Sequence, residues 1–170
     1  MNKLKCLIWL VVIFSSSINA KPFEVIGKRD NMYEIEMPAD NNCLFWAVAA
    51  GNNLANGNSL RHRLAERQRN LRNLVVQKYQ TGEYDEELAI VLTSDENEFN
   101  NKDDYLKAIS DNYWGGEIEI LAMSNILQKN ITVHMKNVIP IKYPYGTPYK
   151  KFVHVFYNGS HYNLLSEIKP

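Results

Sequence analysis

The sequence predicts an α/β (α+β) fold in which a small central sheet is flanked by helices. Apolar residues recur at helical spacing through the middle of the chain, whereas residues near both ends alternate between apolar and polar, as half-buried strands do. Asn158-Gly159, the strongest short hairpin signal in the chain, separates the last two strand-like stretches. The chain has 170 residues, 45% of them apolar, which fits one domain with its own core.

The first twenty residues have the order of a secretory signal peptide. Lys3 and Lys5 precede an apolar run at 6–14, and mostly small and polar residues follow at 15–20. The apolar run is too short to span a membrane, which takes about 20 residues. We therefore expect cleavage after Ala20, a secreted product, and no stable membrane anchor after processing.

Processing would leave a single domain, residues 21–170, with 17 basic against 19 acidic residues, since the segment removed contains two lysines and no acid. Cys6 would also be removed, so that Cys43 is the only cysteine of the mature protein and no internal disulfide can form. The balanced charge gives no sign of a nucleic-acid partner. The four histidines are scattered rather than paired at metal-ligand spacing, so we expect no metal and no cofactor.

The first half of the domain begins with strands and continues with helices. Residues 21–37 alternate in the manner of short edge strands. A helix is expected from Cys43, because the apolar run 44–50 follows a turn, and the Asn- and Gly-rich stretch 51–58 predicts a loop. A long helix is expected over 59–80, beginning at a serine cap.

The helix expected over 59–80 carries arginines on the sides that its leucines leave free. Because glutamines and Glu66 interrupt the set, we interpret it as a solvated face rather than as a binding patch. The arginines are Arg61, Arg63, Arg67, Arg69 and Arg72.

The second half of the domain alternates between helices and strands. Helices are expected at 84–92, 103–112 and 117–127, and strands at 131–135 and 152–157. A long proline-containing loop should separate these two strands, and a last strand should begin at Ser160. Gly115 and Gly116 open the third helix and indicate either a close backbone approach or a simple turn.

Cys43 is the candidate nucleophile because turn-forming residues place its thiol at the start of a helix. The unpaired N–H groups and the positive end of the helix dipole there favour a thiolate over a thiol. The same loop, formed by Asp40, Asn41, Asn42 and Cys43, would supply donors for an oxyanion. The alternative is that Cys43 is a small buried residue without chemistry.

His161 is the candidate base, since it follows the hairpin turn and has an amide two residues later. Side chains two apart on a strand share a face, so the Asn163 oxygen could accept a hydrogen bond from the imidazole and orient it toward a thiol. The alternative is a polar residue at a hairpin mouth. His134 and His154 fit that second description, because neither has a carboxamide or carboxylate two residues later.

Three sequence blocks then carry a family resemblance. Asp40-Asn41-Asn42-Cys43-Leu44-Phe45 resembles the D-G-N-C-L-F signature of the ovarian-tumour (OTU) family of cysteine proteases, with Asn41 where the family usually has glycine. Tyr113-Trp114-Gly115-Gly116, followed by Glu119-Ile120, is similar to the W-G-G-x-x-E-L segment of the family, and His161-Tyr162-Asn163 is similar to its late catalytic block. In this order the blocks extend over residues 37–165.

The resemblance implies a papain-type fold and the removal of ubiquitin, or of a ubiquitin-like protein, from lysine. It also implies a monomer that recognises ubiquitin conjugates. The residues that it assigns are Cys43 as nucleophile, His161 as base, Asn163 as its orienter, Asp40 as the residue that orders the oxyanion loop, and Trp114, Gly115 and Gly116 as substrate-binding residues.

An export signal on such an enzyme needs an explanation, because ubiquitin lies in the eukaryotic cytosol. One explanation is an effector that an intracellular bacterium exports and delivers into a host cell. A secreted peptidoglycan peptidase of the NlpC/P60 kind explains the signal better and the three blocks worse. A catalytically inactive ubiquitin-binding module is a third interpretation, which the intact Cys, His and Asn set disfavours.

Overall fold

The computed structural model describes residues 22–94, 98–146 and 148–170, so the expected signal peptide lies outside the described residues. Within these ranges the chain forms strands and helices that share one sheet and one main core, which confirms the predicted fold class. Their order is β1 (Val25–Arg29), β2 (Met32–Ile35), α1 (Cys43–Ala55), α2 (Leu64–Gln80), α3 (Asp85–Thr93), α4 (Lys102–Ser110), α5 (Glu117–Leu127), β3 (Asn130–Met135), β4 (Val138–Tyr143), β5 (Phe152–Tyr157) and β6 (Tyr162–Ser166).

The sheet has six strands in the order β1-β2-β6-β5-β3-β4. Only β3 and β5 pair in parallel, with Asn130 opposite Phe152 and Met135 opposite Tyr157, and the other pairs are antiparallel. This order brings β2, from the start of the domain, beside β6, from its end. The residues that follow β2 therefore lie next to the last hairpin.

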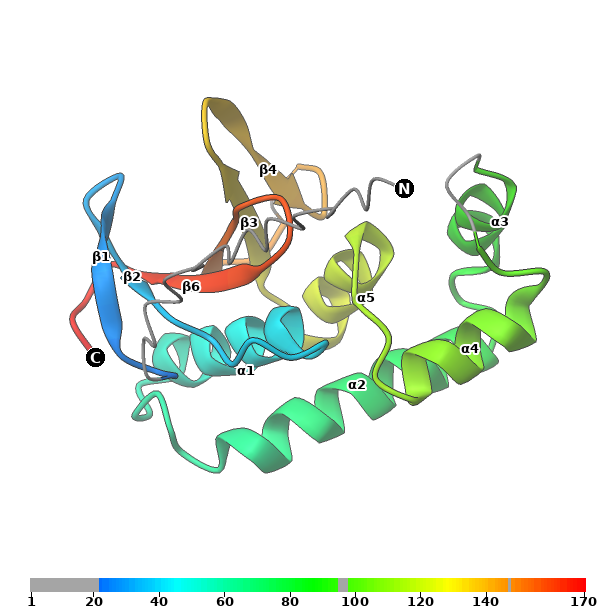
Figure 1. The fold of residues 1–170 in the computed structure, drawn as a ribbon, viewed down its shortest axis with the longest axis horizontal. Helices are drawn as coiled ribbons and strands as arrows, with labels where there is room; N and C mark the ends of the chain where they lie inside the picture. Colours follow the sequence, from blue (N-terminus) through cyan, green and yellow to red (C-terminus); the bar gives the residue numbers. More distant parts are fainter. Residues whose placement is uncertain (1–21, 95–97, 147) are drawn as a thin grey trace, which may run out of the picture.

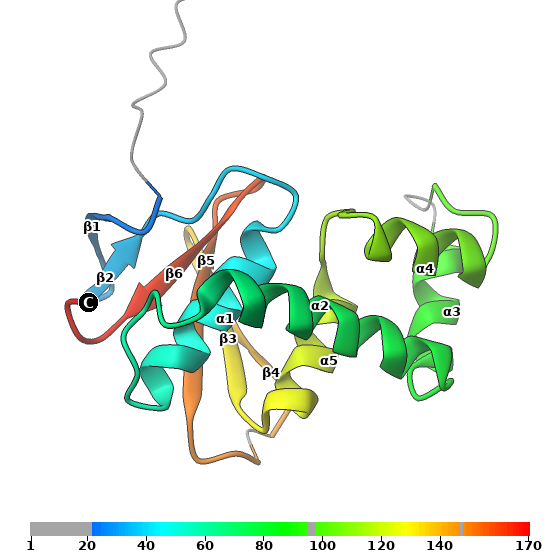
Figure 2. The ribbon, with the colours of Figure 1, turned by 90° about the horizontal axis from the view of Figure 1, so that it is seen from below.

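Helix α1 lies between the sheet and α2 (Figures 1 and 2). Its small residues allow this close packing: a Cβ built on Gly51 would lie 2.5 Å from Val153 Cγ1 on β5. Gly51 is therefore a buried helical residue at a close helix–sheet approach. The loop predicted for 51–58 is wrong over residues 51–55, because α1 continues to Ala55.

Helices α3 and α4 lie at the far end of α2, away from the sheet (Figure 2).

The sheet face opposite α1 carries a small cluster of Met32, Phe156 and Leu165, and the Arg29 guanidinium lies 3.7 Å from the centre of the Phe156 ring. None of the described helices is long and apolar enough to cross a membrane.

The starts of α2 and β6 differ from the sequence prediction. Helix α2 begins at Leu64 rather than at 59, since the buried Asn53 amide donates to the Leu60 and His62 carbonyls, both at 2.9 Å, and holds the preceding segment as a turn. Strand β6 begins at Tyr162 rather than at Ser160. By contrast, α5 and β5 have the predicted bounds.

Strand β4 was not predicted, because its sequence contains Pro140. It lies at the edge of the sheet and pairs only with β3. An edge strand has one side that needs no backbone donor, so proline is tolerated there.

Candidate active site

Cys43 is the first residue of α1, and Asp40 organises the turn before it. Asp40 Oδ1 accepts a hydrogen bond from the Asn42 N–H at 2.8 Å, and Oδ2 accepts one from the Trp46 ring N–H at 3.1 Å. The Cys43 N–H donates to the Asp40 carbonyl at 3.2 Å. Asp40 therefore connects the turn that precedes the thiol to the first turn of the helix that follows it.

The two asparagines of this loop each bind another part of the chain. Asn41 Oδ1 accepts a hydrogen bond from the Trp114 ring, and Asn42 Oδ1 accepts one from the buried Gln68 amide at 2.9 Å. Asn42 is the N-cap residue of α1, but its side chain makes no capping hydrogen bond. Asn41 is not among the described residues with positive φ, so the loop accommodates it without backbone strain.

Gly115 approaches the start of α1 closely. A Cβ on Gly115 would lie 2.8 Å from Leu44 Cδ2 and 3.1 Å from the Phe45 ring, both on α1. The close approach that the sequence left open is therefore present. Trp114, which precedes the two glycines, is about half exposed.

A fully buried carboxyl group, Glu119, holds the turn that contains these glycines. Its Oε2 accepts the Gly116 N–H at 2.7 Å, and its Oε1 accepts the Tyr79 and Tyr105 hydroxyls, both at 2.8 Å. Burial raises the pKa of Glu119, and these hydrogen bonds oppose that effect. The sequence had identified Glu119 only as a motif position, whereas the structure shows that it fixes the turn beside the active site.

Arg72 is buried, so the solvated arginine face predicted for this helix is wrong at this residue. Its guanidinium donates to the carbonyls of Ile109 at 2.6 Å, Tyr113 at 3.0 Å and Asn41 at 3.2 Å, and it lies 4.0 Å from the centre of the Phe45 ring. Burial lowers the pKa of Arg72, and nearby negative groups oppose that shift. The Arg72 side chain thus joins the end of α4 and the segment before Trp114 to the loop that precedes Cys43.

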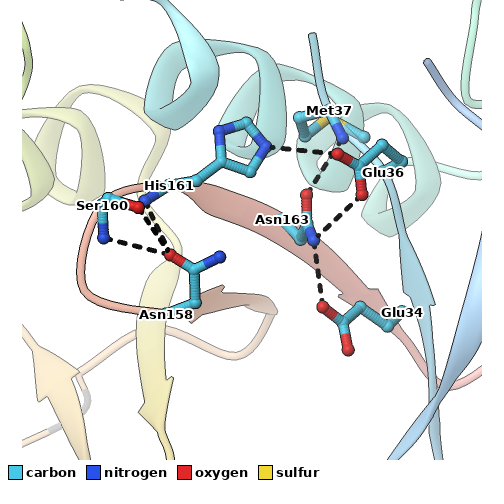
Figure 3. Close-up of polar contacts among 7 residues, drawn as sticks. All are labelled: Glu34, Glu36, Met37, Asn158, Ser160, His161 and Asn163. Atoms are coloured by element: carbon cyan, nitrogen blue, oxygen red, sulfur yellow. Dashed lines mark hydrogen bonds and ion pairs between the residues drawn. The ribbon is translucent and has the colours of Figure 1, made fainter. Parts of the chain in front are cut away.

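The β5–β6 turn presents His161. Asn158 Oδ1 accepts the N–H groups of Ser160 at 3.0 Å and His161 at 2.9 Å, and the Asn158 N–H donates to the His161 carbonyl at 3.1 Å. Figure 3 shows the imidazole turned toward Glu36 on the segment after β2. The distance from His161 Nε2 to Glu36 Oε1 is 3.8 Å.

Asn163 does not make the contact that strand alternation predicted. Its Oδ1 accepts the Met37 N–H at 3.1 Å, and its amide donates to Glu34 at 3.0 Å and to Glu36 at 3.4 Å (Figure 3). No hydrogen bond joins it to the His161 ring in the described part of the chain. The Glu36 carboxylate instead lies near both side chains, with one oxygen 3.4 Å from the Asn163 amide nitrogen and the other 3.8 Å from His161 Nε2.

The thiol and the histidine segment meet where α1 contacts β6. The backbone N–H groups of Tyr162, the residue after His161, and of Leu44 lie close enough to the Cys43 sulfur to lower the pKa of its thiol. Cys43 itself is 5% exposed. The structure therefore places the candidate nucleophile beside the segment that carries the candidate base, although the two come from positions far apart in the chain.

The expectation of a thiolate at the helix start is corrected by burial. Burial raises the pKa of the Cys43 thiol and the Asp40 carboxylate raises it further, whereas hydrogen bonds from the Tyr162 and Leu44 N–H groups lower it. The net direction is upward from the ordinary value of a cysteine. The resting site therefore holds a thiol whose proton must be removed for reaction.

Alkylation of Cys43 should accordingly accelerate as the pH rises. A group with a raised pKa remains protonated through neutral pH, and only the thiolate reacts with iodoacetamide. We expect the rate in the free protein to keep increasing above the ordinary cysteine pKa of about 8.5, measured by intact mass on a chain beginning at Lys21. A rate that is already constant at neutral pH would contradict the direction of the shift.

The remaining histidines take no part in this arrangement. His134 Nε2 and His154 Nδ1 lie 3.0 Å apart on neighbouring strands, so the two rings contact each other. Over residues 22–94, 98–146 and 148–170, no group of three or more His, Cys, Asp or Glu side chains could hold a metal ion.

A thiol at a helix start, beside a histidine on a late hairpin, defines a cysteine-protease type of site. Residues 38–162 match the model of the OTU-like cysteine protease family, and the chain belongs to this family. The sequence blocks at Cys43 and Trp114 lie inside the matched segment, which ends immediately after His161.

Known relatives agree with this membership. Ovarian tumor domain-containing deubiquitinating enzyme 4 of Arabidopsis thaliana is 34% identical over an alignment of 145 positions that covers 77% of this chain and 42% of that protein, so the chain spans less than half of this curated relative. A solved OTU domain in complex with ubiquitin is 26% identical with a TM-score of 0.60, over 79% of this chain and 69% of that one. The OTU protease of Dera Ghazi Khan virus, 22% identical, has the same fold with a TM-score of 0.59, over 81% and 82% of the two chains.

Proposed function

We propose that this chain is a cysteine-dependent deubiquitinase that removes ubiquitin, or a ubiquitin-like protein, from lysine side chains. The observation that carries the proposal is the contact between the Cys43 sulfur and the backbone beside His161, in a chain of the OTU family. The ubiquitin complex of the OTU domain that is 26% identical supports ubiquitin as the substrate.

The proposed reaction uses Cys43 as nucleophile and His161 as base. His161 takes the thiol proton, and the sulfur attacks the carbonyl carbon of the isopeptide bond. The lysine amine leaves with the proton from the imidazolium, and water then hydrolyses the thioester to release the ubiquitin carboxylate and restore the thiol. N–H groups at the start of α1 stabilise the oxyanion, in a loop that Asp40 holds in place.

An apolar groove near the site supports a protein substrate rather than a small peptide. The groove has a volume of about 430 Å³. It lies between α3, α5 and two tyrosines: Tyr143, the last residue of β4, and Tyr145. Ile90 and Tyr145 on its rim are 71% and 77% exposed. We propose that the globular body of ubiquitin rests on this helical side, while its tail passes Trp114 and the two glycines.

The test is a covalent adduct with ubiquitin that carries an electrophile in place of its C-terminal carboxylate. Wild-type protein should gain the mass of one ubiquitin, whereas Cys43→Ala should not react. A short peptide should be turned over poorly, because it lacks the remote binding energy that aligns the scissile bond. Absence of an adduct with ubiquitin-like probes, together with cleavage of a muropeptide, would favour the peptidoglycan peptidase. Ubiquitin binding without an adduct would indicate an inactive module.

We further propose that the protein is exported, with residues 1–20 removed, and that it acts as a monomeric effector in a host cell. The lysine, apolar and small-residue order of the first twenty residues supports export. Expressed in a bacterium, the product outside the cytoplasm should begin at Lys21 by amino-terminal sequencing. A product that begins at Met1 would refute processing.

A further inference from the structure

The side of His161 that faces away from solvent has an acid beside it and no hydrogen-bond partner. His161 Nε2 is buried and, among the described residues, makes no hydrogen bond. The carboxylate of Glu36 lies 3.8 Å away, which is within ion-pair range but beyond a hydrogen bond. A buried ring nitrogen without a partner is costly, so this contact calls for a role.

Glu36 is held firmly enough to orient the ring. Its backbone makes two hydrogen bonds to the segment before β1: the Phe23 N–H donates to the Glu36 carbonyl at 2.7 Å, and the Glu36 N–H donates to the Glu24 carbonyl at 2.9 Å. Its Oε2 accepts the Asn163 amide at 3.4 Å. The other oxygen, Oε1, remains directed at His161 (Figure 3).

The Asn163 amide cannot replace Glu36 in this role in the arrangement observed. Its oxygen faces the Met37 N–H, and its nitrogen faces the carboxylates of Glu34 and Glu36. Carboxylates only accept hydrogen bonds and a backbone N–H only donates, so this network fixes which end of the amide is oxygen. The oxygen that the sequence assigned to the imidazole is therefore used elsewhere.

We propose that Glu36, rather than Asn163, is the residue that positions His161. The inference rests on the proposed function. His161 donates its Nε2–H to Glu36, which leaves Nδ1 to accept the Cys43 proton. The Glu36 carboxylate accepts this hydrogen bond and stabilises the imidazolium. The contact tightens to a hydrogen bond as the ring becomes charged, since such bonds are often long in unliganded enzymes. Asn163 acts through Glu36 by holding its other oxygen.

The test compares variants at three acids of the same region. Glu36→Leu, which removes the acceptor, should lower kcat by about 10²-fold or more with KM unchanged, and Glu36→Gln, which removes only the charge, should lower it less. Glu34→Gln should lower kcat less than either Glu36 variant does, because Glu34 contacts Asn163 but not His161. Glu24→Gln, at an exposed side chain, should retain wild-type kcat.

A readout that needs no substrate completes the test. The nitrogen NMR signals of the His161 ring should show the proton on Nε2 in the wild type and a changed tautomer balance in Glu36→Leu. Wild-type kcat in Glu36→Leu, together with a large loss in Asn163→Ala, would overturn the inference in favour of Asn163. Failure of the wild type to cleave ubiquitin conjugates would overturn the proposed function instead, and the NMR result would still decide the role of Glu36.

Discussion

Replacing His161 by alanine is expected to lower kcat toward a ubiquitin conjugate by about 10²- to 10⁴-fold, the range in which a general base contributes. The effect should be large because burial raises the pKa of Cys43, so the thiol does not lose its proton unaided near neutral pH. The folded state should survive, since the His161 backbone, rather than its ring, makes the turn contacts with Asn158. Turnover of a ubiquitin conjugate and thermal unfolding measure the two expectations.

His154→Ala is the matched control for that experiment. The His154 ring contacts His134 and the Phe152 ring, away from the cysteine loop, so its loss should affect stability more than kcat. If His154→Ala were inactive while His161→Ala remained active, the assignment of His161 as the general base would be wrong.

Arg72→Met should have the largest effect on stability, lowering the free energy of unfolding by about 3 kcal/mol or more. Hydrogen bonds to a charged group contribute about 1.5–3 kcal/mol each, and this substitution removes all three of those that the guanidinium makes. Because one of the three holds the Asn41 carbonyl, the folded fraction should also lose activity. Denaturant unfolding measures the first effect, and kcat corrected for the folded fraction measures the second.

Two variants make the Arg72 result specific. Arg72→Lys keeps the positive charge but lacks the planar guanidinium that donates to several carbonyls at once. It should therefore retain only part of the free energy of unfolding that Arg72 contributes. Arg69→Met, at an exposed position of the same helix, should change the free energy of unfolding by no more than about 0.5 kcal/mol. Equal stability of Arg72→Met and wild type would contradict the assigned role.

The sequence allowed the chemistry of the site to be predicted in part. Cys43 could be found because turn residues and a helix start are local signals, and His161 because an Asn-Gly turn precedes it. Glu36 could not be found in this way, since it reaches His161 only because β2 pairs with β6. The state of the Cys43 thiol was also misjudged, because a helix start favours the thiolate locally whereas burial is a property of the whole fold.

Arg72 illustrates what helical spacing could have shown. It follows the buried Gln68 by four residues and precedes the buried Val75 by three, so it lies on the inward face of α2. Because arginine is charged, its side chain was predicted to face solvent. That prediction overlooked that backbone carbonyls can accept the hydrogen bonds of a buried guanidinium. Those carbonyls come from distant segments and are not visible in the local sequence.

By itself, the sequence determined the class of fold, the candidate nucleophile and base, and the bounds of elements such as α5 and β5, because periodicity, caps and turns act over a few residues. Tertiary structure decided the extension of α1 through Gly51, the edge strand at Pro140, the burial of Arg72 and the carboxylate beside His161. These features depend on contacts between segments far apart in the chain, where packing and hydrogen-bond satisfaction outweigh local propensity.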